Sequence, residues 1–344
     1  MNAPLRASIA LASFNGAAYL QEQLDSLAGQ TIAPFELVVC DDHSTDATVE
    51  IVRAFAATCG FPVRLEINPQ QLGYRQNFMQ AARLCTGDIV LFCDQDDVWQ
   101  PQKIETVLRA FAEDDVLFAY HNADLYFDDG RLGGPVFDDA AQIRQIAPGD
   151  PAPFHRVRGF TQAYRRALHD YDPLWPRSVD QGSEAIEPEA HDLWFLFLAL
   201  SLGRVRYLPD RLALYRQHAR NFSGPTEAAW PHPSGALHEL LEAKTRHNGH
   251  LAVVAACRSA ILADIAANGR PAQRVAAAVQ ATRYARLASV LKNRAATINA
   301  PTLLTRLAAF VRNCLGGGYR RGNPWALRLR WLPQDFLTAL RLRA

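Results

Sequence analysis

The chain has 344 residues, of which 49% are hydrophobic and 21% are charged. This composition is ordinary for a globular protein and excludes a low-complexity chain, and the length fits one large domain with an appendage or two domains. The net charge of +1 is unevenly spread, because residues 270–344 hold 14 Lys and Arg but a single acid, Asp335.

The first 112 residues alternate short apolar runs with longer amphipathic stretches. The predicted strands occupy residues 8–12, 35–40, 62–67 and 89–93, and the predicted helices occupy residues 17–29, 47–58, 73–85 and 101–112. This alternation favours an α/β fold with a parallel sheet and right-handed crossovers. The polar strand ends at 13–16, 41–46 and 94–97 are therefore expected along one sheet edge, where such sheets bind ligands.

Three carboxylates follow the apolar run Ile89–Cys93, namely Asp94, Asp96 and Asp97. Acids this close repel one another unless a cation compensates them. Hard oxygen ligands suit Mg²⁺ or Mn²⁺, which commonly take phosphate oxygens as further ligands. The sequence therefore favours a metal–phosphate site here, and a solvated acidic turn is the alternative.

Glycine-rich dinucleotide and P-loop patterns do not occur in this half of the sequence. A nucleotide can still be held by acids, because Asp41 or Asp42 can accept from a base N–H and Asp94 can accept from ribose hydroxyls. Asp42 can equally be an acid of an Asx-turn.

Four motifs in order resemble the family 2 glycosyltransferases with a GT-A fold: Ala12-Ser13-Phe14-Asn15, the segment 39–46, the segment 73–77, and Cys93-Asp94-Gln95-Asp96-Asp97-Val98-Trp99. The last of these resembles the rhamnosyltransferase-type branch. The resemblance covers about residues 6–224. It implies a Rossmann-like, mostly parallel sheet flanked by helices, a nucleotide-diphospho-sugar donor, a divalent metal, and inversion at the anomeric carbon.

The resemblance also implies roles for individual residues. Asp42 would contact the base and Asp94 the ribose, and Asp96 would bind the metal with His218. The full set implied for donor binding is Ala12, Ser13, Asn15, Asp42, Asn77, Asp94, Gln95 and Arg216. The segment 158–166 resembles the part of the family that lines the acceptor pocket, and the acceptor set is Trp99, Gly159, Thr161, His191 and Trp194.

Pro188 opens a strongly apolar predicted helix that runs to about Leu202. Asp192 lies in its first turn, where the helix dipole favours a carboxylate, and an ionised carboxylate in a cleft can act as a general base. The family places its catalytic base at this point, although it more often has Glu-Asp where this chain has His191 and Asp192. The alternative is a helix-terminal acid without a catalytic role.

A strand is predicted over residues 206–215, followed by Arg216, His218 and Arg220. The arginines can clamp phosphates, and His218 can bind the metal or the diphosphate. A lone exposed His is the alternative. Residues 128–153 are predicted as a loop over the active-site edge, and residues 176–187 as another loop.

Residues 225–344 are predicted as a helical, basic C-terminal region that follows a catalytic domain over residues 1–224. Basic and apolar residues interleave in this region, which fits either an anionic membrane surface or packing on the protein body. Nucleic acid is not expected, because no reader motif accompanies the charge.

The six cysteines form no Cys-x-x-Cys pair, and Cys40 and Cys93 lie in apolar runs, which is typical of reduced buried thiols. Neither a signal peptide nor an uninterrupted run of 18 apolar residues is present, so no transmembrane helix is expected. These features favour a cytoplasmic location, with the basic region on the inner face of the cytoplasmic membrane.

The sequence therefore predicts a metal-dependent inverting glycosyltransferase of cell-surface polysaccharide synthesis. The resemblance implies dTDP-rhamnose as donor and a cell-surface or lipid-linked saccharide as acceptor. Two alternatives are a catalytically silent sugar- or lipid-binding scaffold and a sugar nucleotidyltransferase. The second would need a Gly-rich basic loop after the first strand, which Ser13-Phe14-Asn15-Gly16 does not supply.

Overall fold

The computed structural model describes residues 4–150, 153–183, 185–218, 237–316, 318 and 332–340. These residues form two compact units. The sheet unit contains the described residues of 1–147, 156–172 and 190–228, and the helical unit contains those of 148–155, 173–189 and 229–344. The boundary predicted at residues 224/225 lies outside the described residues.

The sheet unit confirms the predicted α/β class. Its strands are β1 (Ala7–Ser13), β2 (Glu36–Asp41), β3 (Val63–Ile67), β4 (Ile89–Cys93), β5 (Val98–Trp99), β6 (Val116–Phe127), β7 (Leu132–Pro135), β8 (Gln145–Ile146), β9 (Gln162–Arg165) and β10 (Arg204–Gln217). Its helices are α1 (Leu20–Ala28), α2 (Thr48–Ala56), α3 (Tyr74–Leu84), α4 (Lys103–Ala110) and α5 (His191–Leu202), with the 3-10 segments η1 (Asp139–Ala141), η2 (Gly159–Thr161) and the start of η3 (Arg166–Arg177).

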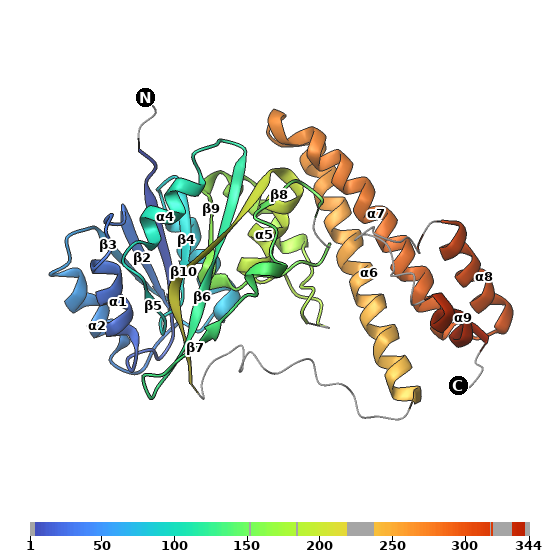
Figure 1. The fold of residues 1–344 in the computed structure, drawn as a ribbon, viewed down its shortest axis with the longest axis horizontal. Coiled ribbons are helices and arrows are strands. Elements are labelled where there is room, and N and C mark those ends of the chain that lie inside the picture. Colours follow the sequence, from blue (N-terminus) through green and yellow to red (C-terminus); the bar gives the residue numbers. More distant parts are fainter. Residues whose placement is uncertain are drawn as a thin grey trace. The chain divides into compact units, whose positions relative to one another are not determined.

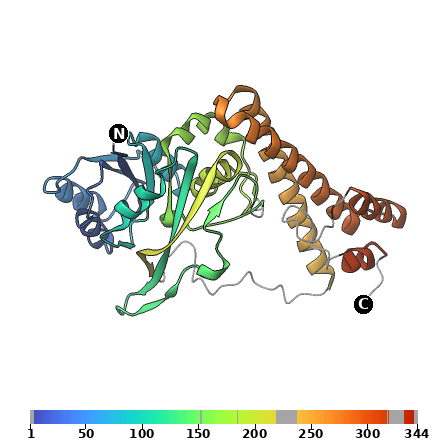
Figure 2. The ribbon, with the colours of Figure 1, turned by 45° about the horizontal axis from the view of Figure 1, so that its top comes forward.

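The strands form one ten-stranded sheet in the order β3-β2-β1-β4-β9-β6-β10-β5, with β7 on β6 and β8 on β10. Strands β1 to β4 are parallel, and β6 is parallel to β10. Strand β9 is antiparallel to both β4 and β6, which it joins. Figures 1 and 2 show these strands side by side in the sheet unit.

Three short pairings were not predicted from the sequence. Residues 128–153 are not a loop throughout, because β7 and β8 fall within them and pair with β6 and β10. Strand β5 pairs antiparallel with β10, joining Val98 to Leu214 and Trp99 to Ala213. This last pairing ties the acidic loop after β4 to the far end of the sheet.

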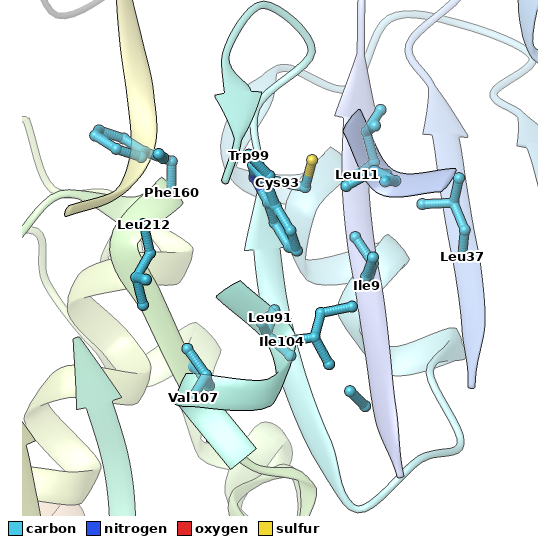
Figure 3. Close-up of a cluster of buried hydrophobic side chains, with 14 of the residues drawn as sticks. Ile9, Leu11, Leu37, Leu91, Cys93, Trp99, Ile104, Val107, Phe160 and Leu212 are labelled. Atoms are coloured by element: carbon cyan, nitrogen blue, oxygen red, sulfur yellow. The ribbon is translucent and has the colours of Figure 1, made fainter. Parts of the chain in front are cut away.

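The core follows from the alternation of side chains along each strand. Ile9, Leu91 and Cys93 lie on the sheet face that α1, α2 and α4 cover, together with Trp99 and Ile104 (Figure 3). Burial of such side chains drives the two layers together, at about 25 cal/mol per Å² of apolar surface.

The other face of the sheet is covered by α3 and α5. Phe92 of β4 contacts Phe78 of α3 and Phe195 of α5, with ring centroids 5.7 and 5.9 Å apart. Tyr164 of β9 stacks on Phe195 at 4.0 Å. This aromatic cluster fixes α5, which carries His191 and Asp192 at its first turn, against the centre of the sheet.

The helical unit contains α6 (Leu237–Asn268), α7 (Pro271–Asn299), α8 (Leu303–Leu315) and α9 (Leu332–Leu340). Pro271 begins α7 in the first helical turn, which its fixed φ favours. Helices α6 and α7 run side by side as a hairpin in both views (Figures 1 and 2). The helical character predicted for residues 225–344 is confirmed in the described part of that range.

A buried ion pair organises the helical unit. Arg258 of α6 binds the carboxylate of Glu189, and both side chains are almost completely buried. The guanidinium also donates to the Pro153 carbonyl at 2.7 Å and to the Gln181 side chain at 3.2 Å. Arg258 therefore joins segments 148–155 and 173–189 to the helix hairpin, although both segments lie within the first 189 residues of the sequence.

One stretch of the described chain, Arg246–Asn268 in α6, is long and apolar enough to cross a membrane by length and composition. Packed helices in the cores of globular proteins share this property, and 39% of the most apolar part of this stretch is buried. All six cysteines are free thiols, and Cys40 and Cys93 are buried as predicted.

Candidate functional site

The acidic loop after β4 lies beside the end of β10. The pairing of β5 with β10 brings residues 94–97 next to Arg216 and His218, more than one hundred residues later in the chain. Asp96 and His218 meet directly, with 2.8 Å between Asp96 Oδ2 and His218 Nε2. The His218 ring stacks on Tyr19, with centroids 4.6 Å apart.

Arg216 fixes the backbone of this loop. Its N–H donates to Asp97 Oδ1 at 3.0 Å, and its Nε donates to the Asp96 carbonyl at 2.8 Å. Its guanidinium pairs with Glu22 of α1 and lies over the rings of Tyr19 and Tyr126. These contacts hold Asp96 in place. They also occupy much of the Arg216 guanidinium, so Arg216 could bind a phosphate, as predicted, only with the hydrogen-bonding positions that remain.

Asp97 and Lys103 form the buried floor under the loop. Both are fully buried, and burial raises the pKa of Asp97 and lowers the pKa of Lys103 to about 7. Lys103 Nζ donates to the Phe160 carbonyl at 2.9 Å and lies 3.6 Å from the centre of the Trp99 ring. Asp97 is thus a structural acid of the motif, whereas Asp94 and Asp96 are partly exposed.

The charge of Asp94 is opposed by two nearby carboxylates and by its own burial. Withdrawal from water, with the charges of Asp96 and Asp192, raises the pKa of Asp94 to about 7. Asp192 therefore lies close enough to Asp94 to act on it electrostatically, although about one hundred residues separate them. The structure brings the predicted ribose, metal and base carboxylates together at one edge of the sheet.

Asp192 is held by the start of α5. Its Oδ1 accepts from the Leu193 N–H at 2.9 Å. Gly159 lies against it, because a Cβ at Gly159 would be 3.4 Å from Asp192 Cβ and 3.4 Å from His191 Nε2. Of the predicted acceptor residues, Gly159 and His191 are thus adjacent to the predicted base.

His191 itself faces the interior. It is 5% exposed and stacks on Phe78 at 4.0 Å, with Phe92 at 4.6 Å. Burial lowers the pKa of His191 to about 3, so the ring is neutral beside Asp192. With so low a pKa, His191 is a poor proton acceptor beside Asp192.

The acids after β2 are used by the protein itself. Asp41 accepts from the hydroxyls of Ser13 and Ser44 at 2.9 and 2.6 Å, and from the Ser44 N–H at 2.8 Å. Asp42 accepts from the backbone N–H groups of Leu72 and Gly73 at 2.7 and 2.8 Å. Asp42 can contact a nucleotide base, as predicted, only through carboxylate lone pairs that these two bonds leave open.

Asn77 is likewise placed behind the strand ends. It is buried, and its amide donates to the Cys40 carbonyl at 2.9 Å and accepts from Asn68 at 2.9 Å. Asn68 also donates to Asp42 at 3.0 Å. Asn77 and Asn68 therefore support the loop that carries Asp42, and direct donor binding by Asn77 stays a prediction.

The turn after β1 is locked to the two acidic loops. Gln95 accepts from the Phe14 N–H at 2.9 Å and donates to the Phe14 carbonyl at 3.1 Å. A Cβ at Gly16 would lie 2.2 Å from Gln95 Oε1, so a side chain there would displace the Gln95 amide from Phe14. Asn15, at a φ of 46°, accepts from the Thr45 N–H at 2.9 Å.

Of the remaining predicted site residues, two lie at the end of β1 and three are buried in the interior. Ala12 and Ser13 end β1 at this edge, as predicted. Trp99, Thr161 and Trp194 are at most 2% exposed. Contact of these three with an acceptor would require the surrounding side chains to move, and their role stays a prediction.

Sequence reasoning missed three residues of the site, Tyr19, Glu22 and Lys103. Tyr19 and Glu22 reach His218 and Arg216 from the start of α1, and Lys103 reaches the acids from α4. No local pattern marks them, because each is identified only by a partner far along the chain. A lysine at the start of a helix otherwise predicts an exposed side chain.

The donor atoms suit a hard divalent cation. Asp96 and His218 converge within 2.8 Å and are half-buried or buried, which leaves further positions for water and ligand oxygens. Within the part of the chain that the structure describes, no group of three or more His, Cys, Asp and Glu residues gathers to hold a metal ion. A cation here would therefore depend on the substrate for part of its ligand set.

The comparisons with known proteins agree with this fold. Residues 8–171 match the model of glycosyl transferase family 2. An uncharacterized glycosyltransferase of Nostoc sp. is 25% identical over 63% of this chain and 66% of its own length. An Escherichia coli protein named UDP-Glc:alpha-D-GlcNAc-diphosphoundecaprenol beta-1,3-glucosyltransferase is 28% identical over 37% of this chain and 49% of its own. The alignments thus cover less than two thirds of these relatives.

Two solved structures share the fold. Staphylococcus aureus TarS 1-349 in complex with UDP-GlcNAc has a TM-score of 0.53 at 16% identity, covering 92% of this chain and 93% of that one. The Pyrobaculum calidifontis mannosyltransferase PcManGT, in complex with GDP-Man and Mn²⁺, has a TM-score of 0.50 at 18% identity, covering 98% and 87%. The predicted GT-A fold is confirmed, and within it residues 8–171 are the part of the chain that matches the family 2 glycosyltransferase model.

Proposed function

We propose that this protein transfers a sugar from a nucleotide-diphospho-sugar to a hydroxyl of a saccharide or lipid-linked saccharide, with inversion at the anomeric carbon. The observation that carries the proposal is the meeting of Asp94, Asp96, His218 and Asp192 at one sheet edge. The family supports the reaction class, and the nucleotide sugars named with the two solved structures support the donor class.

Asp192 acts as the general base. It accepts the proton of the acceptor hydroxyl as that oxygen forms a bond to the anomeric carbon. The bond from that carbon to the diphosphate breaks on the opposite face, and the electron pair leaves with the diphosphate. Attack and departure on opposite faces give inversion. Burial lowers the pKa of His191 to about 3, below the ordinary value of an aspartate, so His191 is the weaker base and the proton moves to Asp192.

A divalent cation fits this site, held by Asp96 and His218. When bound, it would neutralise negative charge on the diphosphate. Arg216 keeps Asp96 oriented through the Asp96 carbonyl, and Gln95 keeps the turn after β1 close to the same loop. Arg216 and Gln95 thus position the edge of the sheet at which the nucleotide-sugar donor would bind.

The donor is dTDP-rhamnose in this proposal, because the Asp94-Gln95-Asp96-Asp97-Val98-Trp99 motif resembles the rhamnosyltransferase-type branch. The E. coli relative's name includes a diphosphoundecaprenol acceptor, which supports a lipid-linked acceptor here. Such an acceptor would place the enzyme at the cytoplasmic face of a membrane, with residues 270–344 towards anionic lipid.

Nucleotide release from a panel of dTDP-, UDP- and GDP-sugars tests the proposal, each with Mg²⁺, with Mn²⁺ and with chelator. We expect slow metal-dependent release from one donor, fastest with dTDP-rhamnose. Asp96→Ala should abolish it, while the exposed control Asp25→Ala should not. Release that persists in chelator would contradict the metal assignment, and preference for another nucleotide would contradict the rhamnose donor.

A further inference from the structure

Helix α8 carries two polar residues on its buried face and two leucines on its exposed face. Arg306 and Asn313 are buried, at 5% and 1% exposure. Leu304 and Leu315 are 79% and 84% exposed on the opposite face. Ala308 and Val311 lie between these leucines and are exposed too. Their spacing places all four on one stripe of the helix, here called the α8 stripe.

The orientation of α8 is fixed by specific hydrogen bonds. Arg306 Nε donates to the Ala339 carbonyl at 2.9 Å, and Arg306 Nη1 donates to the Ala300 carbonyl at 3.0 Å. Phe310 packs against Phe336 of α9 with centroids 5.4 Å apart. Rotating the helix to bury the leucines would leave a buried guanidinium without these acceptors, which is costly. The exposed leucines are therefore a stable property of this unit.

Cations flank the α8 stripe. Arg312 is exposed on α8, and Arg286 of α7 donates to the carbonyl of Gly316, the residue after Leu315, at 2.7 Å. Between residues 246 and 316 the only acid in the sequence is Asp264, which pairs with Arg177. Asp335 is buried against Arg294. Among the described helices, an apolar stripe thus lies beside positive charge with no exposed acid close in sequence.

Exposed leucines flanked by arginines suit an anionic lipid surface better than a second copy of the chain. A second copy of the same face would bring Arg286 and Arg312 against their own counterparts, and like charges oppose such a contact. An anionic lipid surface instead receives the leucines in its acyl boundary and the guanidiniums among its phosphates. We propose that the α8 stripe, flanked by Arg286 and Arg312, is the surface by which this protein lies on an anionic bilayer. The inference deepens the membrane contact proposed above and rests on it.

Co-sedimentation with vesicles tests this assignment. We expect the protein to bind phosphatidylcholine vesicles that contain phosphatidylglycerol, and to bind pure phosphatidylcholine much less. Leu304→Ser with Leu315→Ser should weaken vesicle binding by more than about tenfold, because two apolar side chains lose their burial. Arg312→Gln should weaken it by about fivefold at low salt, and by less at high salt. Ile143→Ser, an exposed apolar control on the sheet unit, should bind as the wild type does.

Circular dichroism would show that the variants keep their helices, as expected for exposed positions. Equal vesicle binding by the wild type and the double leucine variant would overturn the proposal. A dimer in light scattering that this variant abolishes, without lipid binding by the wild type, would instead assign the stripe to a second copy. Release of nucleotide without vesicles is expected to be unchanged in all variants. Loss of vesicle binding with intact release would therefore separate this inference from the proposed chemistry.

Discussion

The acids that follow strands β2 and β4 are used in different ways. After β2, the carboxylates of Asp41 and Asp42 are buried and accept hydrogen bonds from Ser13, Ser44 and the 72–73 backbone. After β4, Asp94 and Asp96 remain partly exposed, and the charges of Asp96 and Asp192 act on Asp94. The first pair holds the loops together, while the second set faces outward with like charges close together.

This difference shows that an acidic motif does not by itself identify a ligand site. A carboxylate whose lone pairs are filled by protein donors stabilises the fold, whereas one with open lone pairs near other acids needs a cation or a proton. Substitution at the two strand ends should therefore give different results, stability loss at one and activity loss at the other.

The largest effect is expected from Asp192→Asn. The amide keeps the shape and still accepts from Leu193, but it cannot take the acceptor proton. We expect kcat for sugar transfer to fall by about 10²–10⁴-fold, with the donor Kd nearly unchanged. Transfer assays with isothermal titration of the nucleotide would measure both.

A matched control for this prediction is Asp172→Asn, an acid that pairs with Arg83 in the same unit. It should retain turnover. If Asp192→Asn reduced donor affinity as strongly as turnover, Asp192 would belong to donor binding and the assignment as base would fail.

An intermediate effect is expected from Asp41→Asn, which tests whether the acids after β2 stabilise the fold. The amide nitrogen cannot accept, so the hydroxyls of Ser13 and Ser44 lose their charge-assisted donation to a buried carboxylate oxygen. We expect the free energy of unfolding to fall by about 2–3 kcal/mol. Urea titration would report this as a lower midpoint at constant m-value.

The exposed acid Asp25 provides the comparison for Asp41. Asp25→Asn removes one charge from a surface helix and should change the unfolding free energy by less than about 0.5 kcal/mol. Equal effects at Asp25 and Asp41 would mean that the carboxylate of Asp41 is hydrated rather than bonded to the loops.

The smallest effect concerns pH and His191, the neutral neighbour of Asp192. The folded pKa of about 3 lies below the ordinary value of 6.5, so the unfolded chain binds a proton first as pH falls. The stability that this neutral ring contributes is complete above pH 6.5 and is lost between pH 6.5 and about 3, at about 1.4 kcal/mol per pH unit.

His191→Phe should remove this contribution and keep the stack on Phe78. The variant's unfolding free energy should therefore fall less steeply with acid than that of the wild type, as urea titrations at several pH values would show. Burial also lowers the pKa of His121 and His155, so both proteins should retain some acid sensitivity. Parallel pH profiles would mean that His191 is accessible to protons in the folded state.

The sequence was sufficient for the regular part of the fold. The period of the apolar residues predicted strands β1 to β4 and helices α1 to α4 close to their observed bounds, because each segment has one or two buried faces of its own. The resemblance also predicted the acids that meet at the sheet edge.

The parts that could not be predicted depend on contacts between distant residues. Strand β5 is two residues long and forms only because β10 is beside it. Asp42 is bonded by the backbone of Leu72 and Gly73, whereas Asp96 contacts His218. These partners are not adjacent to either acid in sequence. Periodicity and local motifs carry no information on such pairings.

The Arg258–Glu189 pair makes the earlier part of the chain depend on the C-terminal helices. A chain shortened before α6 would retain Glu189, Trp175 and Gln181 but lose the cation that neutralises this buried carboxylate. An unpaired buried charge costs several kcal/mol, so the first 224 residues should express poorly as an independent piece. Exchange of C-terminal helices between relatives by recombination should then succeed only when segments 148–155 and 173–189 travel with them.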